Sequence, residues 1–246
     1  MMTGATTAGG MAILGAKVRP VSLTGIALLQ GMAPADIASL TTACAVRRYT
    51  QEQEIVGQES DNKDVFFVAE GRVRVTVFAP NGTEIAFRDL SAGASFGELS
   101  AIDGLARSAS VVALADSVLA SLSRVRFWTL LREQPTVTEH VLKNLASLVR
   151  SLSERVVDYG TLAVQNRIQA ELVRMAREAG VRANQALIAP VPRHAEVASR
   201  VATNREAVAR EFNRLAREGV LERRRGVLAV LDVGRLAEMV EKVRET

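Results

Sequence analysis

Hydrophobic and polar positions alternate with a period of two through the first half of the chain. Valines occupy positions 73, 75 and 77, and polar side chains occupy positions 72, 74 and 76 between them. This alternation predicts a half-buried β-strand, and the turn sequence Pro80-Asn81-Gly82 predicts a hairpin that returns over 84–90. Further short strands are predicted over 65–69, 109–114 and 118–123, after a short helix over 33–44. Strands of this length and spacing are typical of a β-barrel or jelly roll.

The period lengthens to that of an α-helix after Pro135. Apolar residues recur every three or four positions along one face: Val141, Leu145, Leu148, Leu152, Val156, Tyr159 and Ala163. Such a face needs a second apolar surface, which is either the chain's own β-structure or the same helix of a second copy. Gly160-Thr161 interrupts the helical propensity. We therefore expect a domain boundary there, with Thr161 capping a second helix over 161–179 that Gly180 ends.

A helix-turn-helix is predicted near the C-terminus. Residues 196–201 form a short helix, and a tight turn follows in which Thr203 or Asn204 caps a second helix over 205–218.

The second of these helices carries Arg205, Glu206 and Arg210 near its N-terminus. Arginine donates hydrogen bonds to guanine O6 and N7, and glutamate accepts one from cytosine N4. A solvated charged face is the alternative for an isolated helix, but the short helix and tight turn before it favour DNA reading.

Charge divides the chain in the same place as the helical pattern does. The 246 residues suffice for two modest domains, and 24% of them are charged, as in ordinary globular proteins. Residues 1–160 carry 15 Lys and Arg against 16 Asp and Glu, whereas residues 161–246 carry 16 against 11. The positive excess therefore lies in the last third, which favours nucleic-acid binding there.

Several classes of protein are excluded by composition. The single cysteine, Cys44, rules out an internal disulfide and a cysteine-bound iron–sulfur cluster, and two histidines are too few for a multi-histidine metal site. No apolar run reaches the ~18 residues of a membrane span. Residues 1–20 lack the features of a signal peptide, so we expect a flexible tail and a cytoplasmic protein. No catalytic constellation is visible, so we do not expect an enzyme.

The stretch F-G-E-L-S-A-I-D-G-L-A-R-S-A-S-V-V over 96–112 carries the candidate ligand chemistry. Gly97 has no Cβ, so backbone N–H groups can approach an anion there. Arg107 offers a planar fork of donors for a phosphate, and Ser108 adds a hydroxyl. Glu98 repels phosphate and suits a ligand hydroxyl such as that of a ribose. Together these residues describe a pocket for a phosphorylated sugar.

Both informative stretches resemble those of one protein family. Residues 96–112 resemble the phosphate-binding cassette of cyclic-nucleotide-binding domains, and Arg205-Glu206-x-x-x-Arg210 resembles the recognition helix of the CRP/FNR regulators. The resemblance implies an α+β chain with a flexible tail over 1–20, a jelly-roll cyclic-nucleotide-binding domain over 21–134, a long dimerisation helix over 135–160 and a winged helix-turn-helix DNA-binding domain over 161–246. Residues 221–225 and 227–231 resemble the wing hairpin, and a last helix over 233–243 looks like an addition.

The resemblance also implies site residues and partners. Ligand contacts are expected from Gly97, Glu98, Leu99, Ser100, Arg107, Ser108, Leu152 and Ser153. DNA contacts are expected from Thr203, Asn204, Arg205, Glu206, Arg210 and Arg224. The expected partners are cAMP or cGMP as allosteric ligand, with no prosthetic group, double-stranded DNA with palindromic TGTGA-like half-sites, and RNA polymerase as a further candidate. In this family the long helix is the dimer spine, which favours a homodimer; no membrane partner is expected.

The base of the nucleotide stays undecided at this point. Leu152 stands where members of the family have a hydroxyl residue that touches the adenine, and Ser108 could reach the 2-amino group of a syn guanine. The cyclic nucleotides cAMP and cGMP are therefore both candidate ligands. A regulatory module that acts on a protein partner, with no DNA contact, is the alternative function. A haem or redox sensor on the same fold is disfavoured by the single cysteine.

Overall fold

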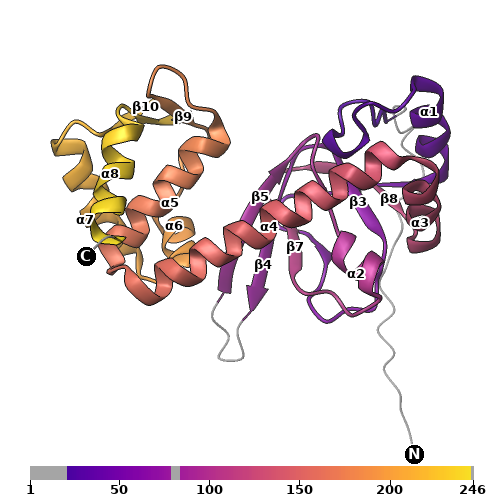
Figure 1. Cartoon of the computed structure of the whole chain (residues 1–246), viewed down its shortest axis with the longest axis horizontal. Helices are drawn as coiled ribbons and strands as arrows, with labels where there is room; N and C mark the ends of the chain where they lie inside the picture. The colour runs from indigo at the N-terminus through magenta and orange to yellow at the C-terminus, as the bar shows by residue number, and fades with distance from the viewer. Residues whose placement is uncertain (1–20, 79–83, 245–246) are drawn as a thin grey trace, which may run out of the picture.

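The computed structural model describes residues 21–78 and 84–244, so the predicted tail and the Pro80-Asn81-Gly82 turn lie outside the described residues. Figure 1 shows an N-terminal domain of β-strands, which we call the roll, one long helix, and a C-terminal domain made mostly of helices. The roll contains the 3-10 turn Ala27–Leu29, helices α1 (Pro34–Ala43), α2 (Glu98–Asp103) and α3 (Arg124–Glu133), and strands β1 (Ala45–Tyr49), β2 (Glu54–Val56), β3 (Val65–Glu70), β4 (Arg72–Phe78), β5 (Glu84–Ser91), β6 (Ser95–Phe96), β7 (Ser110–Ala113) and β8 (Ser117–Leu122).

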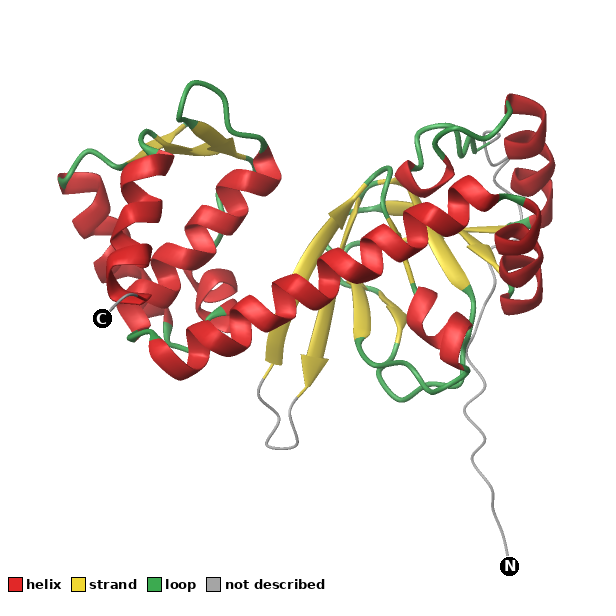
Figure 2. Cartoon of the chain, viewed as in Figure 1, coloured by secondary structure: helices red, strands yellow, loops and turns green. Residues whose placement is uncertain are grey.

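The strands of the roll form two four-stranded antiparallel sheets. Their orders are β1-β8-β3-β6 and β2-β7-β4-β5. The predicted hairpin is confirmed, because β4 pairs with β5 from Arg72 opposite Ser91 to Phe78 opposite Glu84. Buried side chains from both sheets form one core cluster, in which the rings of Phe66 and Phe96 stack with centroids 5.0 Å apart. This arrangement confirms the predicted jelly-roll type of fold (Figure 2).

The long helix α4 (Pro135–Thr161) runs from the roll to the C-terminal domain (Figure 1). Thr161 is its last residue and donates its hydroxyl to the Val157 carbonyl, while Ala163 stands at the start of the next helix without a side-chain cap. The prediction that Thr161 caps a new helix is therefore wrong. A single glycine in a helix costs only about 1 kcal/mol, and a threonine hydroxyl is readily satisfied by the carbonyl four residues earlier.

The apolar residues of α4 divide between two faces. Val141 is buried against the roll, whereas Leu142, Val149 and Val156 have 61%, 62% and 71% of their surfaces exposed. The single apolar seam predicted from the sequence is thus two neighbouring stripes, one that covers the chain's own roll and one that faces outward. Figure 2 shows α4 running across the roll toward the C-terminal domain.

The C-terminal domain has the predicted helices and hairpin strands in the predicted order, with one further strand, β9 (Ala186–Ile188), that was not predicted. The domain contains α5 (Val164–Ala179), β9, α6 (His194–Arg200), α7 (Arg205–Arg217), β10 (Leu221–Arg224), β11 (Val227–Val230) and α8 (Val233–Arg244). The side chain of Asn204 accepts a hydrogen bond of 2.8 Å from the Ala207 amide, so Asn204 is the cap of α7. Gly180 follows α5 with a φ of 89°, a conformation that suits glycine. Strands β10 and β11 form the predicted hairpin, and β11 also pairs with β9.

No helix among the described residues is long and apolar enough to cross a membrane.

Candidate functional site

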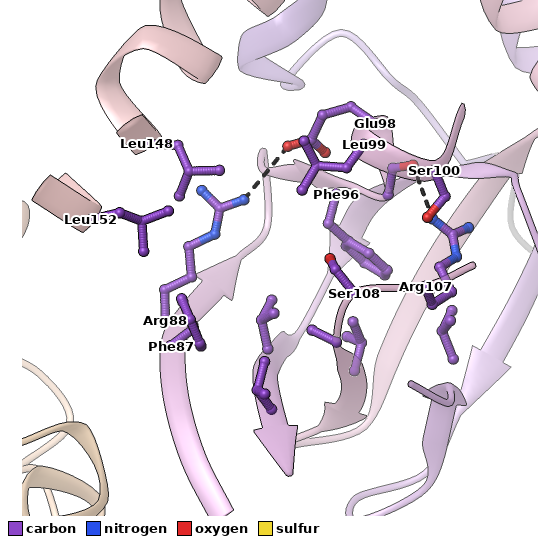
Figure 3. A pocket seen from close by; sticks show the side chains of 16 residues that line it. Phe87, Arg88, Phe96, Glu98, Leu99, Ser100, Arg107, Ser108, Leu148 and Leu152 are labelled. Atoms are coloured by element: carbon purple, nitrogen blue, oxygen red, sulfur yellow. Dashed lines mark hydrogen bonds and ion pairs between the residues drawn. The ribbon is translucent and has the colours of Figure 1, made fainter. Parts of the chain in front are cut away.

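A cavity of about 260 Å³ opens in the roll beside α4. Its walls are apolar side chains from the strands, including Val75, Phe96 and Val111, and its outer rim is formed by Leu148 and Leu152 of α4. The polar end holds Glu98, Ser100, Arg107 and Ser108, as Figure 3 shows. An apolar cavity with a few convergent polar groups is the usual form of a small-molecule site. The structure thus brings Gly97, Leu99 and these four residues together as predicted.

Gly97 shapes the polar end of the cavity. Its φ is 93°, and a Cβ at this position would lie 2.7 Å from both Arg107 Nη1 and the Asp64 carbonyl oxygen. Only glycine therefore allows the Arg107 guanidinium to lie against this turn. The carbonyl of Gly97 accepts a hydrogen bond of 2.9 Å from Arg107 Nη1.

Arg107 is 4% exposed and holds the turn together. Its Nη2 atom donates to Asn62 Oδ1 at 2.6 Å and also to the Asp64 carbonyl, and its guanidinium lies over the Phe66 ring. Burial lowers the pKa of Arg107, while the negative charges of Asp64 and Glu98 act in the opposite direction. The Nε atom is buried and has no hydrogen-bond partner among the described residues. The sequence indicated a free fork, but part of this fork already binds the protein.

Glu98 begins the short helix α2 and faces the cavity. Its Oε1 atom lies 3.8 Å from Nη2 of Arg88, an ion pair at the limit of such contacts. Its Oε2 atom is buried without a hydrogen-bond partner in the described part of the chain. A buried carboxylate oxygen with no donor is an acceptor site that a hydroxyl can fill.

The two serines of the polar end differ in availability. Ser100 is buried and its hydroxyl donates to the Ala106 carbonyl at 3.4 Å, so it helps to hold the loop before Arg107. Ser108 lines the cavity, and Figure 3 shows its hydroxyl beside Phe96. Leu99 is 38% exposed and also lines the cavity.

The structure separates the two predicted base contacts on α4. Leu152 lines the cavity, whereas Ser153 does not, and the hydroxyl of Ser153 donates to the Val149 carbonyl at 3.0 Å. Successive residues of an α-helix point about 100° apart, so only one of the two can face this cavity within the same chain. Ser153 stays a predicted contact that this chain alone does not bring to the pocket.

Several lining residues were not among the predicted ligand contacts, and two of them are consecutive on β5, Phe87 and Arg88. Regular strand alternation would point one of them away from the cavity. The ladder with β4 is irregular here, because Val75 pairs with Arg88 and Thr76 pairs with Ala86, which leaves Phe87 unpaired. This β-bulge explains why consecutive residues line one cavity.

A second polar surface lies at the start of α7. Arg205 and Glu206 have side chains that are 77% and 56% exposed and that pair at 2.8 Å, and Arg210 is also exposed. The opposite face of the helix is buried through Val208 and Leu215. Arg205, Glu206 and Arg210 are therefore presented outward as predicted.

The other predicted DNA contacts of the C-terminal domain are engaged to different degrees. The Asn204 side chain is used as the helix cap, Thr203 is half-buried, and Arg224 of β10 pairs with Glu222 at 2.6 Å. Arg223 and Arg225 beside it on the hairpin are exposed.

A polar junction connects the roll to α6. Asp89 of β5 binds Arg74 Nε at 2.7 Å and Arg200 Nη2 of α6 at 3.2 Å. Arg74 also pairs with Glu196 of α6 at 3.3 Å, and Arg200 pairs with Glu171 of α5 at 3.1 Å. We call these five charged residues the junction. One of them, Asp89, directly follows the cavity residue Arg88 in the sequence.

Comparisons with known proteins match both domains. A model of the cyclic nucleotide-binding domain matches residues 46–134, and a model of the Crp-like helix-turn-helix domain matches residues 166–239. The cyclic AMP receptor protein of Thermus thermophilus is 31% identical over 223 residues, which cover 88% of this chain and 98% of that protein.

Two solved structures share the fold. A mutant of CooA from Carboxydothermus hydrogenoformans has a TM-score of 0.72 at 22% identity and covers 82% of this chain and 90% of its own. The c-di-GMP responsive global regulator CLP of Xanthomonas campestris has a TM-score of 0.65 at 18% identity, over 80% of this chain and 99% of its own.

The matches include both the cavity domain and the helix-turn-helix, and one relative is similar along nearly its whole length. They confirm the predicted fold class, and the relatives' family is one of regulators and not of enzymes. The chain belongs to the CRP/FNR family of DNA-binding transcription regulators.

Proposed function

We propose that this regulator responds to a purine 3′,5′-cyclic nucleotide, cAMP or cGMP, which binds in the cavity of the roll. One observation carries the proposal. Glu98 Oε2 and Arg107 Nε, an acceptor and a donor, are both buried without partners among the described residues, and both residues line the same cavity. Unpaired buried polar groups cost about 1–3 kcal/mol each. A ligand that brings a hydroxyl to Glu98 and an anionic oxygen to Arg107 relieves both costs.

A ribose cyclic phosphate has these two groups a few atoms apart. Ser108 adds a hydroxyl at the same end of the cavity, and the apolar walls suit the faces of a purine. The similarity to a protein named as a cyclic AMP receptor supports this class of ligand. A c-di-GMP responsive protein shares only the fold, so the family alone leaves the nucleotide unspecified.

The active form is proposed to be a homodimer formed through α4. Leu142, Val149 and Val156 are exposed and recur every seven residues, the spacing of a two-stranded coiled coil. Pairing this stripe with that of a second copy places two α7 helices for two half-sites of a palindrome, for which TGTGA-like sequences are the candidates. RNA polymerase is a candidate partner of the DNA-bound dimer, and such a regulator acts in the cytoplasm.

The signal is proposed to travel through β5. Phe87 and Arg88 line the cavity, while the Ala86 amide donates to Ser199 of α6 at 3.0 Å and Asp89 binds Arg200 of α6. A ligand that shifts this short segment changes the contacts that hold α6, and with it the position of α7. The family assignment favours DNA over the alternative of a purely protein-binding module.

A double-mutant cycle with the ligand tests the proposed binding mode. Calorimetry would compare wild type and Glu98→Gln with cAMP and cGMP and with their 2′-deoxy forms. We expect Glu98→Gln to weaken binding of the ribonucleotides about tenfold or more and to leave the 2′-deoxy forms almost unaffected, because the lost contact is to the 2′-hydroxyl. Absence of binding of every nucleotide to the wild type would overturn the proposal. If Glu98→Gln loses the same affinity for the ribonucleotides and for their 2′-deoxy forms, Glu98 does not contact the 2′-hydroxyl of the ribose.

A further inference from the structure

We infer that Arg88 reads the base of the bound nucleotide and selects guanine over adenine. This inference rests on the proposed function, because it assigns the base subsite of the same cavity. Three features of the site support this role of Arg88.

The first feature is the pairing of β5 with β4. Arg88 lies directly opposite Val75, which also lines the cavity, so both side chains point to the same face of the sheet. The β-bulge at Phe87 adds a second, consecutive residue of β5 to this face. Without this bulge, Arg88 and Phe87 would point to opposite faces of the sheet. The guanidinium is therefore directed into the site by the backbone.

The second feature is the position of Arg88 relative to the phosphate and ribose groups. Figure 3 shows Arg107 and Ser108 on one side of the cavity and Arg88, Leu148 and Leu152 on the other, with Glu98 contacting Arg88. A ribose held at Glu98 with its phosphate toward Arg107 directs the base toward Arg88. The Arg88–Glu98 distance of 3.8 Å is longer than a hydrogen bond, so the guanidinium keeps its donors for a ligand.

The third feature is the chemistry that surrounds the base. Leu148 and Leu152 contribute no polar atoms on the α4 side, so the Arg88 side chain, which is 40% exposed, is the charged group there. A guanidinium makes two parallel hydrogen bonds to guanine O6 and N7. Adenine offers N7 but presents its N6 amino donors where O6 would be, and two donors repel. The site therefore favours a purine with a carbonyl at C6.

Calorimetric titration with cAMP, cGMP and cIMP tests the inference. The hypoxanthine base of cIMP keeps O6 and N7 but lacks the 2-amino group that Ser108 could contact. We expect cGMP and cIMP to bind about tenfold more tightly than cAMP, a difference of about 1.4 kcal/mol. Tight binding of cGMP together with weak binding of cIMP would assign the selectivity to the 2-amino group and overturn the role of Arg88. Equal binding of all three would also overturn it.

Two variants of Arg88 and one control locate the effect. Arg88→Met should weaken cGMP and cIMP to the level of cAMP, and Arg88→Lys should recover only part of the difference because a lysine lacks the planar fork. Arg48→Met, an exposed arginine on β1 outside the cavity lining, should change none of the three affinities. Unchanged selectivity in Arg88→Met, with nucleotide binding retained, would refute the inference and leave the proposed function standing. If the wild type binds none of the three nucleotides, both the inference and the proposed function are refuted.

Discussion

Arg200 Nη2 lies 3.2 Å from Asp89 Oδ2, and this contact joins helix α6 of the DNA-binding domain to strand β5 of the roll. Arg200 is 5% exposed and its second carboxylate partner is Glu171, while Asp89 is also bound by Arg74. Arg88, the residue before Asp89, lines the cavity of the roll. The candidate ligand cavity and the DNA-binding domain thus contact consecutive residues of one strand, so mutations at the junction can test whether the two are coupled.

Replacing Asp89 with asparagine should loosen the DNA-binding domain from the roll. The substitution removes a negative charge between two arginines, so α6 should exchange its amide hydrogens faster while α3 stays protected. The DNA affinity of this variant should change less on addition of nucleotide than that of the wild type. Asp61→Asn, at an exposed site in the roll, is the control. Unchanged exchange in α6 would show that Asp89 does not hold it.

The same contact should also depend on pH. Burial alone would raise the pKa of Asp89, but the hydrogen bond and charge of Arg74 and the charge of Arg200 bring this pKa below its ordinary value of 3.8. A lowered pKa means stabilisation that is complete above about pH 4 and lost as pH falls through the lower value. Thermal stability of the wild type should therefore fall more steeply from pH 5 to pH 3 than that of Asp89→Asn. Parallel curves would contradict this expectation.

Gly97→Ala should damage the ligand site. Its φ of 93° costs an alanine about 1–2 kcal/mol, and the new Cβ would lie 2.7 Å from Arg107 Nη1. Arg107 must then move from its position against the turn, so nucleotide affinity measured by calorimetry should fall at least tenfold. Gly25→Ala is the matched control, because nothing lies within 4 Å of a Cβ there. Equal nucleotide affinity of the two variants would argue against a role for this turn.

An acidic substitution on α4 should separate the two copies of the chain. Val149 is 62% exposed on the outward stripe, and Val149→Asp would place two carboxylates at the proposed helix pair. Light scattering at micromolar concentration should give a monomer for this variant and a dimer for the wild type. Val125→Asp, at a valine of α3 that is 77% exposed, should remain a dimer. A dimer of Val149→Asp would place the interface elsewhere.

Arg205→Ala should reduce specificity for DNA more than overall affinity. Arg205 stands at the exposed start of α7, and a bidentate contact to guanine contributes about 1–3 kcal/mol of discrimination. Specific binding should fall about tenfold or more while binding to random-sequence DNA changes little. Arg223→Ala on the exposed hairpin should instead weaken both kinds of binding by similar factors. Equal losses in Arg205→Ala would make Arg205 a phosphate contact.

Sequence patterns over a few neighbouring residues correctly predicted several strands and the starts of several helices. Alternation identified β4, and the pair of capping residues Thr203 and Asn204 indicated the start of α7, where Asn204 is the cap. The end of α4 was harder, because Asp158 near its C-terminus is held by Arg174 and by Arg244 of α8, two residues far away in sequence. Those ion pairs, together with the small cost of one glycine, let α4 continue to Thr161.

The part of the candidate site that lies in one short stretch of sequence was predictable, whereas the contacts between distant strands were not. Gly97, Glu98 and Arg107 belong to one short stretch, so their meeting could be expected. The bond from Arg107 to Asn62 spans 45 residues, and Arg88 reaches the cavity through its pairing with Val75 of β4. Neither relationship has a signature in the sequence alone, because both depend on how distant strands pair.

The most direct test of the account is DNA binding measured with and without nucleotide. Fluorescence anisotropy would titrate the full chain onto a duplex with palindromic TGTGA-like half-sites and onto a scrambled duplex, each with no ligand, with cAMP and with cGMP. We predict that a cyclic nucleotide tightens binding to the palindrome at least tenfold, with cGMP more effective than cAMP, and hardly changes binding to the scrambled duplex. Affinity for the palindrome that neither nucleotide alters would contradict the account.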